Sequence, residues 1–387
     1  MPPLSIPCLF STAMWVGLVW TSASSSIMYN GRGRPSRRDV PLPGYNRNTD
    51  PDLLLDRTPL VLLDDPAVPP FVAEAGGCNG YVKYCNKRLS QVFWMGAHNA
   101  LTDGKDSLFV QRNQYVDGPR LLDAGIRYLD IDTCAYVKDG HRVSPVVCHG
   151  TLWWFTILYR STHEGLVLIK QWMDAHPREV IFLNFGDIDD FTVLNDSFEA
   201  TPTETLKLEL LPVLRAVFGR MAILRGDEWG AAVQRDAVTL QDLIDVNRRV
   251  IVNIGKDRSQ SPLYWAQDDM ICDDEWYPDS LGVDFFRLDY TWGPAYEHIE
   301  RRMRRPCATR PQILNKLEFE FHTALGGTID SDHVGTALAT YLDDLHTKNG
   351  NATEPFFPFN LILTDHSDKW RAYYPEWHAV HLSFYRD

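Results

Sequence analysis

The sequence predicts an α/β protein built around a parallel β-sheet, and three observations support this fold class. From about residue 77 onward, short apolar runs alternate with longer amphipathic stretches, which is the pattern of strand–helix units. Several of the apolar runs end in polar residues, as strands do at the rim of a parallel barrel where active sites are built. With 387 residues, the chain is long enough for one large α/β barrel with tails or for two domains.

Six segments have the apolar character of buried strands. They cover residues 92–99, 126–132, 144–150, 179–187, 249–257 and 360–368. Residues 163–177 are expected to form a helix, because their apolar positions recur at helical spacing until Pro177 ends the segment. A second helix is expected at residues 204–218. The alternation of the two element types favours a parallel sheet.

The first 25 residues have the features of a secretory signal peptide. An apolar stretch runs from about Ile6 to Trp20, small residues follow around Ala23, and the first charged residue is Arg32. An uncleaved membrane anchor is the alternative, but a span needs about 20 apolar residues. We therefore expect residues 1–25 to be removed and the protein to be secreted.

Residues 26–76 are rich in Pro, Arg and Asp and lack hydrophobic periodicity, which predicts a disordered lead-in or a propeptide. Arg37 and Arg38 form a candidate processing site within it, although a solvated basic run explains the pair equally well. Residues 77–387 are then expected to form a single barrel domain.

Composition and charge exclude some classes of function. The chain carries 51 acidic against 38 basic residues, a net charge of −13, which speaks against binding nucleic acid. The same charge speaks against long-range attraction to anionic lipid surfaces. The 12 Trp, 16 Tyr and 18 Phe exclude a mostly disordered chain.

The cysteines agree with secretion. Cys8 lies in the predicted signal peptide, and the remaining six form an even set that suggests three disulfides. Pairing sequence neighbours gives Cys78–Cys85, Cys134–Cys148 and Cys272–Cys307, which is one of several connectivities. A zinc site competes with this interpretation, but no Cys-x-x-Cys spacing occurs. Asn195 and Asn351 stand in triplets that accept glycosylation.

Oxygen-bearing side chains gather at the predicted strand ends. Asp130 and Asp132 are two residues apart on one strand, so both point to the same face. Two such carboxylates repel each other unless a cation or a shared proton lies between them. Asn99 and Asp187 follow two other strands, and four oxygen donors of this kind suit Ca²⁺, or else Mg²⁺.

Two histidines, His98 and His149, also follow predicted strands and suit a general base and a general acid. A divalent cation with two histidines is an arrangement for cleaving a phosphodiester. Arg127 points to the opposite face from Asp130 and is expected to form a structural ion pair. Asp365 and His366 lie on the last strand, which need only close the barrel.

Three segments resemble a known family. FWMGAHNALTD, GIRYLDIDTC and PVVCHG are similar to the active-site segments of phosphatidylinositol-specific phospholipase C. The stretch CNGYVKYCNKRLSQVFWMGAHNA also resembles the opening of secreted fungal PLC-like phosphodiesterases. The resemblance covers residues 78–190 and the final strand NLILTDH. It implies a distorted TIM barrel with phosphoric diester hydrolase activity on a phospholipid or similar phosphodiester, and transient contact with a membrane surface.

The resemblance assigns the two catalytic histidines to His98 and His149. It makes Asn99 and the pair Asp130 and Asp132 metal ligands, as in the metal-dependent branch. The metal-independent branch has Arg at the position of Asp132.

The fourth ligand of the family aligns with Gly186, and Asp187 is one residue away. The lysines that read inositol phosphates have no clear counterpart, which favours a plain phosphodiester over a polyphosphoinositide.

Two other functions remain open on the sequence. Glu318 and Glu320 would lie on one face of a strand, as a glycoside hydrolase in a TIM barrel requires, but this leaves both histidines unexplained. A catalytically decayed secreted barrel that acts as a binding protein is the second alternative, and the departure at Gly186 supports it.

Overall fold

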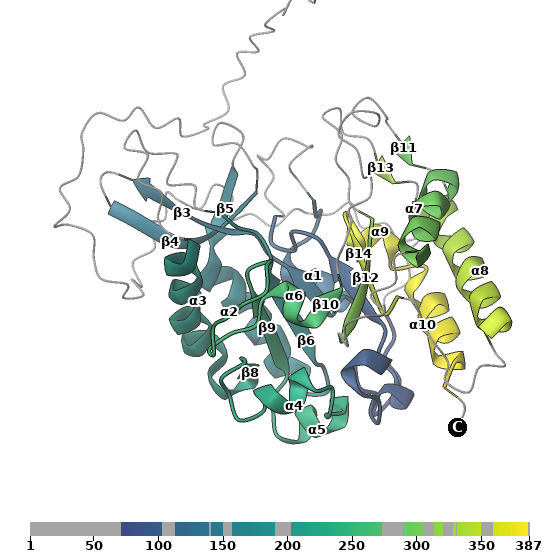
Figure 1. The fold of residues 1–387 in the computed structure, drawn as a ribbon, viewed down its shortest axis with the longest axis horizontal. Helices are drawn as coiled ribbons and strands as arrows, with labels where there is room; N and C mark the ends of the chain where they lie inside the picture. Colours follow the sequence, from purple (N-terminus) through teal and green to yellow (C-terminus); the bar gives the residue numbers. More distant parts are fainter. Residues whose placement is uncertain are drawn as a thin grey trace, which may run out of the picture. The chain divides into compact units, whose positions relative to one another are not determined.

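The computed structural model describes residues 71–102, 113–138, 141–149, 157–189, 203–272, 289–290, 292–304, 313–319, 328–329, 331–349 and 359–385. Eight strands form one parallel sheet in the order β10-β12-β14-β1-β2-β6-β9-β8 (Figure 1). Their bounds are β1 (Trp94–Ala97), β2 (Tyr128–Asp130), β6 (Ile181–Phe185), β8 (Ala222–Ile223), β9 (Val250–Ile254), β10 (Ile271–Cys272), β12 (Leu314–Phe319) and β14 (Leu361–Thr364). Among the described strands, the two at the ends of this order do not pair, so the sheet is curled rather than closed.

Helices flank the sheet. They are α1 (Gly118–Asp123), α2 (Thr162–Ala175), α3 (Thr203–Phe218), α4 (Gly230–Gln234), α5 (Leu240–Asp245), α6 (Gln267–Met270), α7 (Trp292–Arg304), α8 (Ser331–Asn349), α9 (Ser367–Trp370) and α10 (Tyr374–Ser383). Short 3-10 turns include η2 (Val82–Tyr84) and η3 (Leu89–Gln91). None of the helices in the described part of the chain is long and apolar enough to cross a membrane.

The predicted α/β class and its parallel sheet are confirmed. The expected helices at 163–177 and 204–218 correspond to α2 and α3, and α2 begins where the Ser161 hydroxyl accepts a hydrogen bond from the amide of Glu164 at 3.3 Å. Five of the six expected strands belong to the parallel sheet as β1, β2, β6, β9 and β14.

The sixth expected strand differs. Residues 144–150 fall in β4 (His141–His149), which is antiparallel to β3 (Thr133–Lys138) and β5 (Ile157–Ser161). These strands and β7 (Ile188–Asp189) form a separate four-stranded sheet. Only two residues separate β3 from β4, and a parallel crossover needs about a dozen, so the chain can only fold back as a hairpin.

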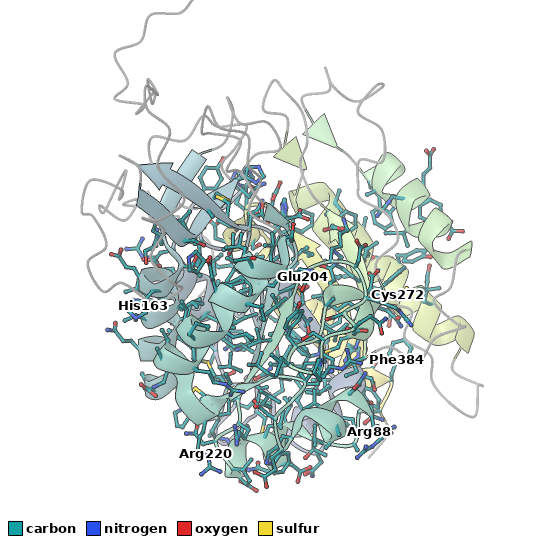
Figure 2. All side chains as sticks on the ribbon, turned by 60° about the vertical axis from the view of Figure 1, so that its left-hand side comes forward. Arg88, His163, Glu204, Arg220, Cys272 and Phe384 are labelled. Atoms are coloured by element: carbon teal, nitrogen blue, oxygen red, sulfur yellow. A yellow bond between two sulfur atoms is a disulfide. The ribbon has the colours of Figure 1, made fainter. Side chains whose placement is uncertain are left out.

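The curl of the parallel sheet decides which side chains face inward. The rings of Trp94 on β1 and Phe182 on β6 meet at 4.8 Å between centroids, although β2 lies between their strands. These two side chains therefore lie on the concave side of the sheet. Figure 2 shows how densely side chains fill the body of the protein. The largest fully buried side chains of the described residues include Trp94, Trp265, Trp370, Trp377, Tyr84, Tyr128, Phe182 and Phe185.

Two predicted disulfides are present, Cys78–Cys85 and Cys134–Cys148, with Cα atoms 4.9 and 6.1 Å apart. Cys272 is also disulfide-bonded, and its expected partner Cys307 lies outside the described residues. The signal peptide, the lead-in up to residue 70, Arg37, Arg38, the two glycosylation triplets and Glu320 also lie outside them, so those predictions stay predictions.

Candidate active site

Strand register brings the polar residues of the site into one row. Polar side chains follow the aromatic residues of the concave face at the carboxyl ends of the strands. His98 comes four residues after Trp94, Asp130 two after Tyr128, and Asn184 two after Phe182. Asp130 is paired with Asn184, and Asn184 with Asn253, across β2, β6 and β9. Ala97 is paired with both Thr364 and Leu129. The next residue along each of these three segments therefore continues the same row, and these residues are His98, Asp365 and Asp130. A curled parallel sheet thus assembles the site from residues far apart in sequence.

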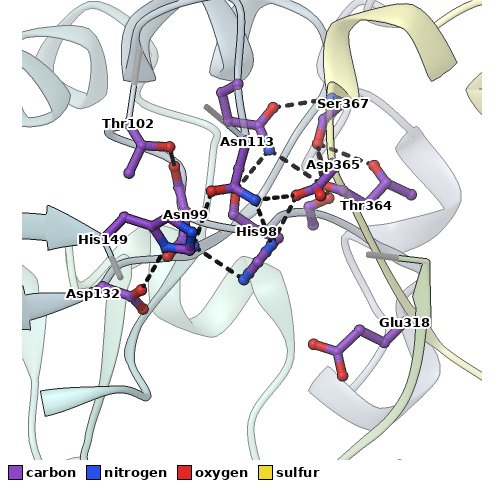
Figure 3. A network of polar contacts seen from close by, with 12 residues as sticks. His98, Asn99, Thr102, Asn113, Asp132, His149, Glu318, Thr364, Asp365 and Ser367 are labelled. Carbon is purple, nitrogen blue, oxygen red and sulfur yellow. Dashed lines mark hydrogen bonds and ion pairs between the residues drawn. The ribbon is translucent and has the colours of Figure 1, made fainter. Parts of the chain in front are cut away.

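His98 forms an ion pair with Asp365. The imidazole Nδ1 lies 2.8 Å from Asp365 Oδ1, and both side chains are almost completely buried (Figure 3). The carboxylate therefore accepts a hydrogen bond from Nδ1–H and leaves Nε2 as the basic nitrogen of His98. Asp365 was expected to be structural from the sequence, and no signal in the last strand distinguished it from a residue that closes the barrel.

His149 has its own carboxylate. Its Nδ1 lies 3.2 Å from Asp132 Oδ2, and the His98 and His149 rings are 6.3 Å apart between centroids. Both members of this second pair keep some exposure, 17% and 13% of their side chains. The site therefore holds two histidines, each oriented by an aspartate and facing one region, which is the arrangement that a proton acceptor and a proton donor need.

Asn99 lies between the two histidines. Its backbone is left-handed, with φ of +48°, a conformation that Asn tolerates better than most residues. Its carbonyl accepts a hydrogen bond from Thr102 Oγ1 at 2.7 Å, which holds the turn after β1. This turn places the Asn99 amide 2.7 Å from His149 Nδ1 and 3.1 Å from His98 Nε2.

The Asn99 amide has two orientations with different consequences. Its other terminal atom lies 2.9 Å from both carboxylate oxygens of Asp132. If that atom is nitrogen, the amide donates to the carboxylate and accepts from the histidines. If it is oxygen, the amide nitrogen donates to Asn113 Oδ1 at 3.2 Å, and two oxygen ligands face each other as they do around a bound cation. In this second orientation, Asn99 and Asp132 fit a hard divalent cation.

Asp130 is held by a neighbouring amide. Its Oδ1 accepts a hydrogen bond from Asn184 Nδ2 at 2.7 Å, and Asn184 also donates to Gln267 Oε1 at 2.8 Å. Burial, and then the charge of Asp132, raise the pKa of Asp130 well above its usual range, and Asp187 adds to the effect. In the described part of the chain, no three His, Cys, Asp or Glu side chains are grouped as a ready metal site.

Gly186 stands where the resemblance places a fourth ligand, and the structure gives a physical reason for the glycine. A Cβ atom at this position would lie 2.9 Å from Asn184 Nδ2 and 2.9 Å from Gln267 Oε1, closer than real Cβ contacts. Asp187 follows directly, partly exposed, and its carbonyl accepts a hydrogen bond from the amide of Thr133 at 3.0 Å. The structure therefore brings together His98, Asn99, Asp132 and His149, with Asp130 and Asp187 beside them.

The other candidate residues have partners of their own. Glu318 forms a buried ion pair with Lys316 at 2.9 Å, two residues earlier on β12. Arg127 forms the expected ion pair with Glu179 at 2.8 Å, on the far side of β2 from the site. His366 stacks on Tyr115 with 4.2 Å between ring centroids and does not replace either candidate histidine.

Asn113 is the site residue that sequence reasoning missed altogether. Its Nδ2 lies 3.0 Å from Asp365 Oδ1, and its Oδ1 lies 3.2 Å from the Asn99 amide. It belongs to no predicted strand or helix, and nothing in its local pattern indicated that it returns to the ends of β1 and β14.

Comparisons with known proteins find relatives of this chain. A family model described as PI-PLC X 1 matches residues 84–271. PI-PLC X domain-containing protein 1 of Arthroderma benhamiae is 35% identical over 127 residues, which are 32% of this chain and 38% of that protein. The matched region thus spans well under half of that relative.

Two of the solved structures that match this chain are bacterial enzymes. The phosphatidylinositol-specific phospholipase C of Listeria monocytogenes has a TM-score of 0.45 at 12% identity, covering 76% of this chain and 95% of that one. The Staphylococcus aureus enzyme has a TM-score of 0.43 at 14% identity, covering 74% and 94%.

Proposed function

This chain belongs to the PLC-like phosphodiesterase superfamily, and we propose that it is a phosphoric diester hydrolase that cleaves a phospholipid or phosphoinositide-type phosphodiester. The observation that carries the proposal is the pair of histidines, 6.3 Å apart, each oriented by an aspartate. A phosphodiester is a suitable substrate because its cleavage needs one proton removed from the attacking oxygen and one delivered to the leaving oxygen.

In the proposed reaction, His98 is the base. Asp365 holds Nδ1–H at 2.8 Å, so Nε2 can take the proton of the attacking hydroxyl, and the buried carboxylate then stabilises the imidazolium. His149, oriented by Asp132, donates a proton to the leaving oxygen. Because the two rings lie close together, one phosphodiester can bridge them.

We also propose that Asn99 and Asp132 hold Ca²⁺, or less favourably Mg²⁺, with Asp130 and Asp187 contributing. The cation would offset the negative charge that develops on phosphorus. Burial is the largest cause of the raised pKa of Asp130, and the charges of Asp132 and Asp187 raise it further, so a cation beside these carboxylates would favour their ionised forms. Oxygen ligands of this type suit these two ions rather than zinc.

The activity is tested with vesicles of phosphatidylinositol and phosphatidylcholine, followed by phosphorus NMR with and without a chelator. We expect a phosphomonoester or a cyclic phosphodiester, and a loss of rate on the order of 10²–10⁴-fold in His98→Gln and in His149→Gln. His176→Gln is the matched control, because His176 takes no part in the proposed site. Its Nδ1 contacts the carbonyl of Trp172 at 2.8 Å at the end of α2. Vesicle binding without any product would identify a decayed barrel, and release of free sugar would identify a glycosidase.

Secretion is part of the same proposal. Buried disulfides such as Cys134–Cys148 fit an oxidising compartment. A secreted phosphodiesterase would meet its lipid substrate in transient contact with a membrane surface. Mass spectrometry of protein from the culture medium should find an N-terminus near residue 26 or further along, whereas an intact N-terminus in the cell pellet would contradict secretion.

A further inference from the structure

Two neighbouring amides, Asn113 and Gln114, contact both strands that carry the His98–Asp365 pair. Neither takes part in the proposed acid and base chemistry. Asn113 is 3% exposed and Gln114 is fully buried, so their hydrogen bonds are shielded from water. A buried amide is costly unless it is satisfied, and each of these two is satisfied by the site itself.

The Asn113 side chain fixes the carboxylate of Asp365. Asp365 Oδ1 receives the Asn113 Nδ2–H at 3.0 Å and His98 Nδ1–H at 2.8 Å (Figure 3). Asn113 Nδ2 also lies 3.3 Å from His98 Nδ1, so the two N–H groups converge on the same oxygen. The amide nitrogen donates to Asp365 Oδ1, and an ionised carboxylate has no proton to offer, so His98 Nδ1 at 2.8 Å is the donor to the same oxygen.

The Gln114 side chain joins the backbones of the two strand ends. Its Nε2 donates to the carbonyl of His98 at 2.6 Å and to the carbonyl of Thr364 at 3.2 Å. Its Oε1 accepts a hydrogen bond from the amide of Ser367 at 3.0 Å. The end of β1 and the turn after β14 are therefore held by one side chain.

The turn after β14 depends on the same segment. His366 has a left-handed backbone, with φ of +49°, which turns the chain immediately after Asp365. The amide of His366 donates to the carbonyl of Asn113 at 2.6 Å. The backbone of Asn113 thus supports the residue next to the carboxylate that its side chain contacts.

We propose that Asn113 and Gln114 are positioning residues that hold His98 in the tautomer with the proton on Nδ1. Asn113 fixes the acceptor oxygen of Asp365, and Gln114 fixes the distance between the two strand ends. His98 Nε2 is then the nitrogen that exchanges protons with the substrate. The catalytic consequence rests on the proposed function, whereas the tautomer rests on the contacts with Asp365 and Asn113 and on the orientation of Asn99 in which its amide nitrogen donates to His98 Nε2.

Asn360 provides a matched control for a purely structural amide. It is also an Asn, 3% exposed, and it precedes β14 at the opposite end from Asp365. Its Nδ2 donates to the carbonyls of Ser90 and Ile313 at 3.1 Å, and its Oδ1 accepts from the amide of Asn315 at 2.7 Å. Its loss should lower stability without reaching His98.

The first test is nitrogen NMR of full-length protein labelled in its histidines, at about pH 8 with a chelator, where imidazoles are neutral. The spectrum of His98→Gln identifies the His98 signals. We expect wild type to show Nδ1 protonated, Asn113→Ala to show a mixture of both tautomers, and Asn360→Ala to match wild type. If Asn113→Ala does not fold, Asn113→Leu, similar in size to Asn, replaces it. A single wild-type tautomer retained in the folded Asn113 variant would overturn the proposal.

The second test uses the kinetics of phosphatidylinositol vesicle cleavage. Asn113→Ala and Gln114→Ala should lower kcat by about 10–100-fold with KM nearly unchanged, because positioning acts on the transition state. Asn360→Ala should keep the wild-type kcat per folded molecule. Equal kcat losses in all three variants would overturn the proposal. If wild type cleaves nothing, the proposed function fails, and the NMR experiment still decides the tautomer.

Discussion

The buried cluster of Tyr84, His378 and His381 predicts that this protein loses stability in mild acid. The Tyr84 hydroxyl lies 2.9 Å from His378 Nδ1 and 3.3 Å from His381 Nδ1, and all three side chains are buried. One hydroxyl hydrogen can serve only one of these nitrogens, so one imidazole accepts and the other donates. The imidazole that accepts is therefore neutral in the folded protein.

The pKa values agree with this. Burial, reinforced by Arg127, lowers the pKa of His378 from 6.5 to about 3. Burial, reinforced by His378 and Lys87, lowers the pKa of His381 well below its ordinary value. Tyr84 keeps its proton, because burial and then Tyr81 raise its pKa well above the usual range. The cluster is thus a pair of bases that the fold prevents from taking up protons.

The direction of the stability change with pH follows from the different protonation of the folded and unfolded states. Below about pH 6.5 the unfolded chain protonates these histidines, whereas folded His378 stays neutral until about pH 3. Its contribution to stability is complete above pH 6.5 and is lost as the pH falls. Each unit of pH in that window costs about 1.4 kcal/mol for such a group, so His378 loses about 2 kcal/mol by pH 5, and His381 adds a loss in the same direction.

The assay is urea unfolding followed by tryptophan fluorescence at about pH 7.5 and about pH 5. Between these two pH values, the free energy of unfolding of wild type should fall by the combined contribution of His378 and His381. His378→Gln should lose about 2 kcal/mol less between the two pH values, since the titrating base is gone. His176→Gln, on the partly exposed end of α2, should behave as wild type. An unchanged pH dependence in His378→Gln would refute the reasoning.

Three further predictions concern individual residues. Arg127→Met should lower the free energy of unfolding by about 3–5 kcal/mol in urea titrations, because it leaves buried Glu179 without its partner; a loss similar to that of an exposed arginine would contradict this. Replacing Cys134 and Cys148 together by Ala should cost about 3 kcal/mol by loop entropy in the same assay, and an unchanged midpoint would show that the crosslink does not stabilise the fold. Asp132→Asn should depress turnover on the order of 100-fold with the melting temperature nearly kept; activity that survives both this change and exhaustive chelation would exclude the metal.

Much of the fold and part of the site could be predicted from local sequence. Buried strands are predicted at residues 179–187 and 249–257, because parallel strands that are covered on both faces consist of continuous apolar runs. His98 and Asn99 stood out because polar residues directly follow such a run. The disulfides Cys78–Cys85 and Cys134–Cys148 could also be predicted locally, because cysteines separated by few residues are close in space.

Other features depended on contacts that no local pattern encodes. The direction of β4 follows from its distance along the chain, because only two residues separate it from β3 and a parallel crossover needs more. The role of Asp365 depends on the pairing of β14 with β1, which joins residues 267 positions apart. Asn113 reaches the same oxygen from an irregular segment, and such segments have no periodicity that reveals where their side chains point.

The sequence by itself determined the class of elements, their order and the chemical types gathered at the strand ends, because hydrophobic periodicity and polar termination are local properties. Only the tertiary structure decided which of those groups meet. From the sequence alone, His98 could pair with any acidic residue at the carboxyl ends of the strands. In the structure His98 pairs with Asp365, and His149 pairs with Asp132. That choice is made by strand order and register, and these are set by the packing of the whole sheet.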